Sequence, residues 1–179
     1  MNAFTGNIQS RNRVIVWLSL LIAVGLILFI FEVYIPRPLP WLKPGLANIS
    51  TLLALYFFNF QAAIIVVIVR VVTGSFLVGT FLNPAFILAM GGGVASTLVM
   101  SLVKTYFSRT FSIFGISILG ALTHNIVQLI LVYLLIVRQP GIFSILPLLL
   151  ISSLFSGAVV ALFSHYLLEK FKNSKGNSL

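Results

Sequence analysis

Residues 14–35 read VIVWLSLLIAVGLILFIFEVYI, a continuous apolar run with a single charged residue, Glu32. An α-helix needs about 20 predominantly apolar residues to cross the hydrocarbon core of a bilayer. The run is too long for the apolar region of a secretory signal, and residues 31–34 offer no cleavage motif of small residues. It therefore predicts a membrane-spanning helix near the N-terminus.

The rest of the chain has the same apolar character. Of its 179 residues, 60% are hydrophobic and 7% are charged, against roughly half and a quarter in an ordinary soluble domain. Eleven residues are Lys or Arg and two are acidic, Glu32 and Glu169, while Asp and Cys are absent. This composition excludes a soluble globular enzyme, and the lack of Cys excludes disulfides and thiolate metal sites. We predict an all-α integral membrane protein.

Prolines and asparagines divide the apolar chain into segments. The connection at residues 36–44 reads PRPLPWLKP, which cannot be helical because proline lacks an N–H and clashes with the preceding turn. Asn83-Pro84 is typical of a helix start, with Asn as the N-cap and Pro at the first helical position. We predict one membrane domain over residues 1–179 that ends in a polar cytoplasmic tail at residues 169–179. Its six expected transmembrane helices cover residues 14–35, 45–58, 61–77, 84–103, 112–137 and 144–168.

The distribution of Lys and Arg predicts the orientation, because cytoplasmic loops carry an excess of these residues. With both termini in the cytoplasm, seven basic residues lie inside and three lie outside. The inside set is Arg11, Arg13, Lys104, Arg109, Lys170, Lys172 and Lys175, and the outside set is Arg37, Lys43 and Arg138. We therefore expect both termini to be cytoplasmic. The net charge of +9 then reflects topology, and no nucleic-acid partner is expected.

Five strongly polar side chains fall within the expected spans: Glu32, Arg70, His124, Asn125 and Gln128. Such groups are costly in hydrocarbon, so they usually face a partner or a watery cavity. His124 and Gln128 are spaced i, i+4 and share a helix face, with Asn125 next to them on the same arc. With the predicted orientation, these groups converge on the outer half of the bundle, which makes them candidates for a binding site.

Each of these groups also has a purely structural interpretation. Arg70 and Glu32 could neutralise each other as a buried pair. The three polar residues of the fifth span could be hydrogen-bonding contacts between helices. Gly91-Gly92-Gly93 predicts a close helix crossing and not a phosphate-binding loop, because no Lys-Ser/Thr follows it.

A set of dispersed motifs resembles a known family. They are Glu32 with Ile35-Pro36-x-Pro38, Pro44-Gly45-Leu46-Ala47-Asn48-Ile49, Arg70, Gly79-Thr80-Phe81, Gly91-Gly92-Gly93, Gly115-Ile116-Ser117, Gly120-Ala121 and His124-Asn125-x-x-Gln128. The combination, spread over residues 14–168, resembles the Gx transporter family, which is also catalogued as heptaprenyl diphosphate synthase component I. That family is grouped with the S components of energy-coupling factor (ECF) transporters, six-helix membrane proteins that capture vitamins or metal ions from outside.

The resemblance implies a six-helix bundle similar to an ECF S component, in the cytoplasmic membrane of a bacterium. It would capture a small, anionic or carbonyl-rich, vitamin- or precursor-like molecule at the outer side. The expected substrate-binding residues are Arg70, His124, Asn125, Gln128, Asn48, Asn83 and Glu32, and the expected lid or mouth residues are Arg37, Trp41, Lys43 and Thr80. We expect no metal and no cofactor. The expected partners are the substrate, membrane lipid, and either an ECF-type energising module or another membrane subunit.

The second family name suggests a competing function. Members that resemble this chain accompany prenyl or quinone biosynthesis and flavin-linked membrane electron transfer, so a non-transport membrane subunit is the alternative. Prenyl diphosphate synthases hold magnesium through aspartate-rich motifs, because hard divalent cations need carboxylate oxygens. A chain without Asp cannot supply that site. We therefore expect no synthase activity from this chain alone.

Overall fold

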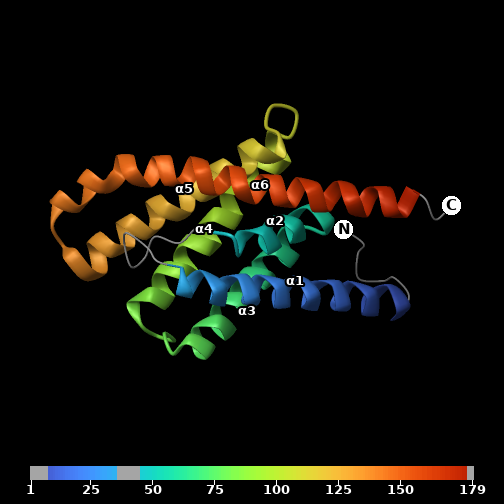
Figure 1. The fold of residues 1–179 in the computed structure, drawn as a ribbon, viewed down its shortest axis with the longest axis horizontal. Coiled ribbons are helices and arrows are strands. Elements are labelled where there is room, and N and C mark those ends of the chain that lie inside the picture. Colours follow the sequence, from blue (N-terminus) through green and yellow to red (C-terminus); the bar gives the residue numbers. More distant parts are fainter. Residues whose placement is uncertain (1–7, 36–44, 177–179) are drawn as a thin grey trace.

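The computed structural model describes residues 8–35 and 45–176, and every regular element within these ranges is helical. The elements are α1 (Ile8–Tyr34), α2 (Asn48–Phe57), α3 (Phe60–Val78), α4 (Pro84–Tyr106), α5 (Ile113–Val132), a π-helical turn η1 (Tyr133–Val137), a 3-10 helix η2 (Pro140–Ile145) and α6 (Leu146–Gly176). The prediction of an all-α fold is thus confirmed (Figure 1).

Helices α1, α3, α4, α5 and α6 pack neighbour against neighbour around the central helix α2. Helix α4 packs between α3 and α5, α5 packs against α6, and α1 packs against α3. Helix α2 contacts α1, α3, α4 and α6, and Figure 1 shows it between α1 and α6. Seven consecutive residues of α2, from Ile49 to Leu55, are buried, so this short helix forms the centre of the core.

Within the described residues, five helical segments are long and apolar enough to cross a membrane. The expected span at residues 45–58 contains the ten-residue helix α2, which at 1.5 Å per residue is about 15 Å long. That is half of the roughly 30 Å hydrocarbon core. The prediction of six full spans is therefore not confirmed. The residues of α2 are apolar because protein surrounds them, and a sequence run does not reveal whether its surroundings are lipid or protein.

Capping residues define the two ends of α3 and the start of α4. Asn59 caps α3, and its Oδ1 accepts a hydrogen bond from the Ala62 N–H at 2.9 Å. Gly79 ends the same helix in the left-handed conformation, with φ of 71°. Pro84 lies in the first turn of α4, as predicted, but the side chain of Asn83 makes no capping hydrogen bond. Asn83 therefore marks the start of α4 through its extended backbone alone.

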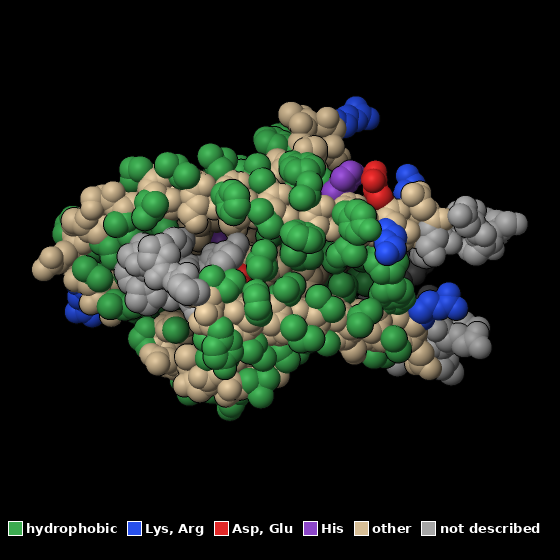
Figure 2. Space-filling view, viewed as in Figure 1, with side chains coloured by type: hydrophobic (Ala, Val, Ile, Leu, Met, Phe, Trp, Pro, Cys, Tyr) green, Lys and Arg blue, Asp and Glu red, His purple; other side chains and the backbone are tan. Residues whose placement is uncertain are grey.

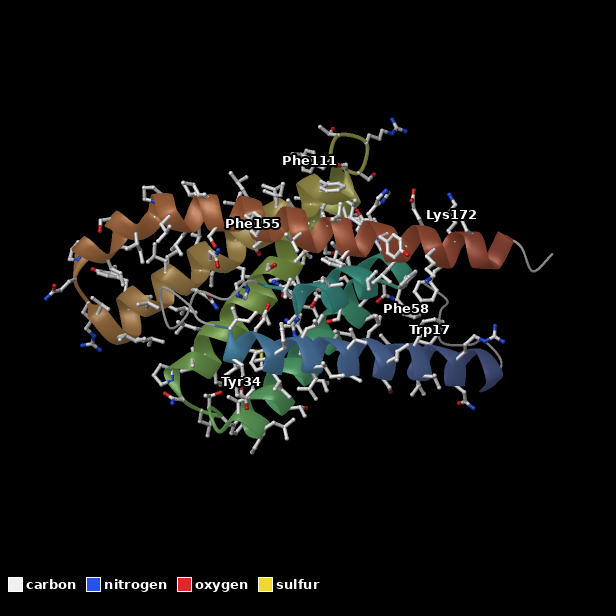
Figure 3. The ribbon with its side chains drawn as sticks, viewed as in Figure 1. Trp17, Tyr34, Phe58, Phe111, Phe155 and Lys172 are labelled. Atoms are coloured by element: carbon white, nitrogen blue, oxygen red, sulfur yellow. The ribbon has the colours of Figure 1, made fainter. Side chains whose placement is uncertain are left out.

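The first turns of α1 and the last turns of α6 lie at the same end of the molecule (Figure 1). Trp17 and Lys172 lie at this end and Tyr34 lies at the opposite end of α1 (Figure 3). The ring of Phe171 joins the helices here, with centroids 5.3 Å from Trp17 and 5.5 Å from Phe57. Several Lys and Arg side chains gather at the same end of the visible face, and apolar side chains cover much of the surface behind it (Figure 2).

Candidate functional site

The most unusual buried group is the guanidinium of Arg70, in the middle of the apolar helix α3. Arg70 is 3% exposed. Its Nη2 donates a hydrogen bond to Oδ1 of Asn48, the first residue of α2, at 3.2 Å. Within the described chain, Nε and Nη1 have no hydrogen-bond partner. A buried donor without an acceptor loses its hydration and gains nothing in return, so these two nitrogens mark a place where an acceptor is missing.

Glu32 lies close to the same point from the other side. It is in the last turn of α1, is 2% exposed, and accepts a hydrogen bond from the Ala47 N–H through Oε1 at 3.3 Å. It also acts electrostatically on Arg70. Arg70 and Glu32 thus hold two consecutive residues, Asn48 and Ala47, at the start of α2. Since Nε and Nη1 remain without partners, Glu32 compensates the charge of Arg70 without filling these donors.

A glycine on α1 makes room for the stem of Arg70. A Cβ placed on Gly25 would lie 3.0 Å from Cδ of Arg70 and would collide with the hydroxyl of Ser50. Ser50 is itself fully buried and donates to the carbonyl of Ala47 at 2.9 Å. The close approach of α1, α2 and α3 at this level therefore requires Gly25. Neither Gly25 nor Ser50 was predictable as a site residue from the sequence, because neither carries charge or belongs to a polar cluster.

His124 and Gln128 lie on the opposite side of α4, packed over Gly92. A Cβ on Gly92 would lie 2.9 Å from Nδ1 of His124 and 3.1 Å from Cγ of Gln128. The next glycine, Gly93, faces α3, where a Cβ would lie 3.0 Å from Cγ1 of Val67. The glycine run therefore lets α4 approach both neighbours closely, which agrees with its interpretation as a helix crossing.

The glycine run also allows the depth of Arg70 in the bundle to be compared with that of the polar residues of α5. Val67 and Arg70 are spaced i, i+3 on the buried face of α3. Arg70 lies eight residues before Val78, and Gly92 lies eight residues after Pro84, so both are about 12 Å from the same end of the bundle at 1.5 Å per residue. Arg70 and Gln128 thus lie at a similar depth, on either side of α4.

Gln128 and Asn125 differ in their surroundings although both are buried. Gln128 is 3% exposed, and its amide makes no hydrogen bond to a described residue. Asn125 donates through Nδ2 to Oγ of Ser153 on α6 at 2.8 Å, and Ser153 donates to the carbonyl of Leu149 at 2.7 Å. Asn125 therefore takes part in the contact between α5 and α6, whereas the amide of Gln128 retains its hydrogen-bonding capacity.

The expected mouth residues are placed differently from Arg70. Thr80 and Asn83 belong to the turn between α3 and α4, where the Asn83 N–H donates to the carbonyl of Thr80 at 3.1 Å. Asn83 is exposed and Thr80 is partly buried. The structure places both beyond the end of α3, away from the depth of Arg70. The remaining lid residues, Arg37, Trp41 and Lys43, lie outside the described residues.

A further buried contact involves Lys104, which lies one residue beyond the expected span at residues 84–103. Lys104 lies in the last turn of α4, and its Nζ donates to the carbonyl of Leu55 near the C-terminus of α2 at 2.6 Å. The same ammonium lies over the ring of Tyr56, 4.5 Å from its centroid. A cation is stabilised at the C-terminal end of a helix, where backbone carbonyls carry partial negative charge. Charged groups therefore hold both ends of α2.

Comparisons with known proteins agree with this fold. The sequence profile of the family described as heptaprenyl diphosphate synthase component I matches residues 21–167. A solved structure of the S component of a bacterial ECF transporter has a similar fold, with a TM-score of 0.67 and 20% sequence identity. The alignment covers 91% of this chain and 97% of that chain. No curated protein sequence matches significantly.

Proposed function

The chain belongs to the heptaprenyl diphosphate synthase component I family, and from this membership and its fold we propose that it is the substrate-capturing membrane subunit of a transporter. It is a multi-pass membrane protein with the fold of an ECF S component. The substrate of this proposal is a small, anionic or carbonyl-rich, vitamin- or precursor-like molecule. It reaches its site from the outer side of the cytoplasmic membrane.

The observation that carries the proposal is the buried guanidinium of Arg70, two of whose nitrogens lack partners among the described residues. An ionisable side chain at membrane depth is expensive and usually serves an ion, a substrate or another charged group. A purely structural pair would use the donors of Arg70 on protein acceptors. Here Nη2 alone does so, on Asn48. A bound molecule with acceptor oxygens would satisfy the remaining nitrogens.

The other predicted site residues take different parts in this proposal. Asn48 orients Arg70, and Glu32 compensates its charge. His124 and Gln128 form the wall of the site on the far side of α4, and Asn125 supports that wall through α6. Thr80 and Asn83, with Arg37, Trp41 and Lys43, form the route of entry. The proposed partners are membrane lipid and either an ECF-type energising module or another membrane subunit.

The access side follows from the proposed orientation. The first turns of α1 and the last turns of α6 lie at the end of the bundle where basic side chains gather (Figure 2), which is the cytoplasmic end by the positive-inside rule. Arg70 is ten residues from Phe60 and eight from Val78, or about 15 Å and 12 Å along the helix. The site then lies slightly nearer to the outer surface.

A second candidate function comes from the description of the family, which names a component of a prenyl diphosphate synthase. In this alternative the chain is a non-transport membrane subunit associated with prenyl or quinone biosynthesis or with flavin-linked electron transfer. The chain has no Asp and only two Glu, so it offers no carboxylate cluster for magnesium diphosphate. The alternative is therefore a scaffold or a lipid-handling subunit and not a synthase.

Native mass spectrometry of the detergent-purified protein distinguishes the two functions. The transporter subunit should release one small polar molecule per chain, and the Arg70→Leu variant should not. Arg109→Leu, in the exposed connection between α4 and α5, is the control and should retain the molecule. Release of a prenyl or quinone lipid would favour the alternative, and an empty wild-type protein would overturn the proposed capture of a substrate.

A further inference from the structure

Directional contacts to other helices hold α2 near both of its ends. Asn48, its first residue, accepts a hydrogen bond from Nη2 of Arg70 at 3.2 Å. The carbonyl of Leu55, in its last turn, accepts a hydrogen bond from Nζ of Lys104 at 2.6 Å. The first contact belongs to the proposed binding site, and the second lies at the opposite end of the same helix.

The middle of α2 offers no comparable contact within the described chain. Ser50 donates to the carbonyl of Ala47 in the same turn, and Oγ1 of Thr51 has no hydrogen-bond partner there. The other residues of 49–55 are apolar, and the burial of apolar surface stabilises without a preferred direction. The directional restraint on α2 therefore comes from its ends.

A displacement of one end of α2 reaches the other end, because hydrogen bonds between successive turns make the helix stiff. Asn48 and Leu55 are seven residues apart, about 10 Å along the helix axis. A shift of the helix at Leu55 would move Oδ1 of Asn48 by a similar amount. The 3.2 Å bond from Arg70 is already at the long end of the usual range for N–H···O bonds. It therefore tolerates little displacement of α2.

Lys104 itself is too far from Arg70 to contact a molecule bound there. Gly92, which lies at the depth of Arg70, is twelve residues before Lys104 on α4, or about 18 Å. A lysine near the end of a span can extend its ammonium into water. Lys104 is instead partly buried, against the carbonyl of Leu55 and the ring of Tyr56. Its connection to the site therefore runs through α2.

We propose that Lys104 is a positioning residue for the Arg70 site, because it fixes α2 so that Asn48 meets the guanidinium. This inference rests on the proposed function and adds to the site a residue from the opposite end of α2. Without the ammonium of Lys104, α2 shifts relative to α3 and Asn48 withdraws from Nη2. Arg70 then loses the contact that orients Nε and Nη1 toward a bound molecule.

Hydrogen exchange of backbone amides tests this link in the purified protein, without any added small molecule. The amides of Asn48 and Ile49 donate to carbonyls in the turn before α2, so their exchange reports the start of the helix. In Lys104→Met their exchange should become about tenfold faster, which corresponds to the loss of one charge-assisted hydrogen bond. Lys104→Arg keeps a cationic donor and should restore slow exchange.

The matched control removes another side-chain donor to a backbone carbonyl of a neighbouring helix. Oγ of Ser117 on α5 donates to the carbonyl of Gly157 on α6 at 2.8 Å. Ser117→Ala should leave exchange at the start of α2 unchanged.

Asn48→Ala tests the same link from the other end of α2. It should speed exchange of the Phe58 amide, which donates to the carbonyl of Ala54 at the end of the helix. This variant decides the proposal if Lys104→Met does not fold, because an unchanged Phe58 amide would overturn it.

Three results with Lys104→Met would overturn the proposal. The first is faster exchange confined to the last turn of α2, and the second is an equal increase in Ser117→Ala. The third is a native mass spectrum in which Lys104→Met retains as much co-purifying small molecule as the wild type. A failure of the proposed function is distinct from these results. The wild-type protein would then be empty, while hydrogen exchange still decides whether Lys104 positions Asn48.

Discussion

Arg70, in the middle of α3, donates a 3.2 Å hydrogen bond to Asn48, the first residue of α2. A charged side chain inside the bundle therefore fixes the start of a helix that is too short to cross the membrane by itself. Any molecule that binds the remaining nitrogens of Arg70 would contact the same junction, because α1, through Glu32, also reaches it at Ala47. In the proposed function, substrate binding and the position of α2 would thus be connected through one guanidinium.

The first prediction concerns topology. The chain has no Cys, so Leu39→Cys and Ser174→Cys each introduce a single labelling site. With both termini cytoplasmic, a membrane-impermeant thiol reagent applied to intact cells should label position 39 and leave position 174 unlabelled. Permeabilised cells should show labelling at both positions, which is the control. Labelling at position 174 in intact cells would invert the model of the topology.

The second prediction separates the two polar residues of α5. Asn125→Leu removes a buried hydrogen bond to Ser153, and should lower the free energy of unfolding by about 0.6 kcal/mol, the typical value for such bonds between membrane helices. Gln128→Leu removes no hydrogen bond to a described residue, so it should leave stability unchanged while reducing the amount of co-purifying substrate. Unfolding in a denaturing detergent titration and native mass spectrometry measure the two effects. Equal loss of stability in both variants would assign both residues to helix packing.

The third prediction tests whether Arg70 contacts the substrate. Arg70→Leu removes a buried positive charge that interacts with Glu32 and should destabilise the protein by about 3 kcal/mol, the lower end of the cost of breaking a buried pair. The double variant Glu32→Leu, Arg70→Leu removes both charges and should recover most of this stability. Substrate binding should remain absent in both variants. Restored binding in the double variant would mean that Arg70 has only a structural role.

The fourth prediction concerns the attachment of α2 at its other end. Lys104→Met keeps the apolar stem but removes the ammonium that binds the carbonyl of Leu55 at 2.6 Å. Loss of this charge-assisted hydrogen bond should cost about 1.5 kcal/mol of stability. Lys172→Met, on the exposed part of α6, is the control and should have no effect. If Lys104→Met proved equally harmless in the detergent titration, the contact with α2 would carry no energetic weight.

The fifth prediction is an absence of chemistry. Without Asp to hold magnesium diphosphate, the purified chain should not elongate farnesyl diphosphate with isopentenyl diphosphate. The reaction is followed by the transfer of radiolabel to a prenyl product. Addition of a complete prenyl diphosphate synthase to the same mixture is the positive control. Turnover by this chain alone would contradict our interpretation of the family description.

Some local features of the sequence act within one or two helical turns. Pro84 and the glycine run at residues 91–93 act through backbone geometry, and the structure places them at a helix start and a helix crossing, as the sequence indicated. The burial of Arg70 was also predictable. A charged side chain in the middle of a long apolar helix avoids lipid by facing the interior of the bundle.

Features that depend on distant neighbours were not predictable in the same way. The apolar run that contains α2 looks the same whether lipid or protein surrounds it. The i, i+4 spacing of His124 and Gln128 defines a shared face, but it did not show that Asn125 would bind Ser153 on α6. Lys104 is 49 residues from Leu55 in sequence, and no pattern along the chain links the two.

The contact between Lys104 and Leu55 also constrains when α2 can finish docking during synthesis of the protein. During synthesis, the end of α2 leaves the ribosome 49 residues before its cationic partner, a delay of about 2–10 s at 5–20 residues per second. Until then the last carbonyls of α2 lack this donor, and hydrocarbon offers them no substitute. Helix α2 therefore completes its docking only after α4 has been synthesised, so the insertion machinery or the water-exposed membrane surface has to hold this short segment in the meantime.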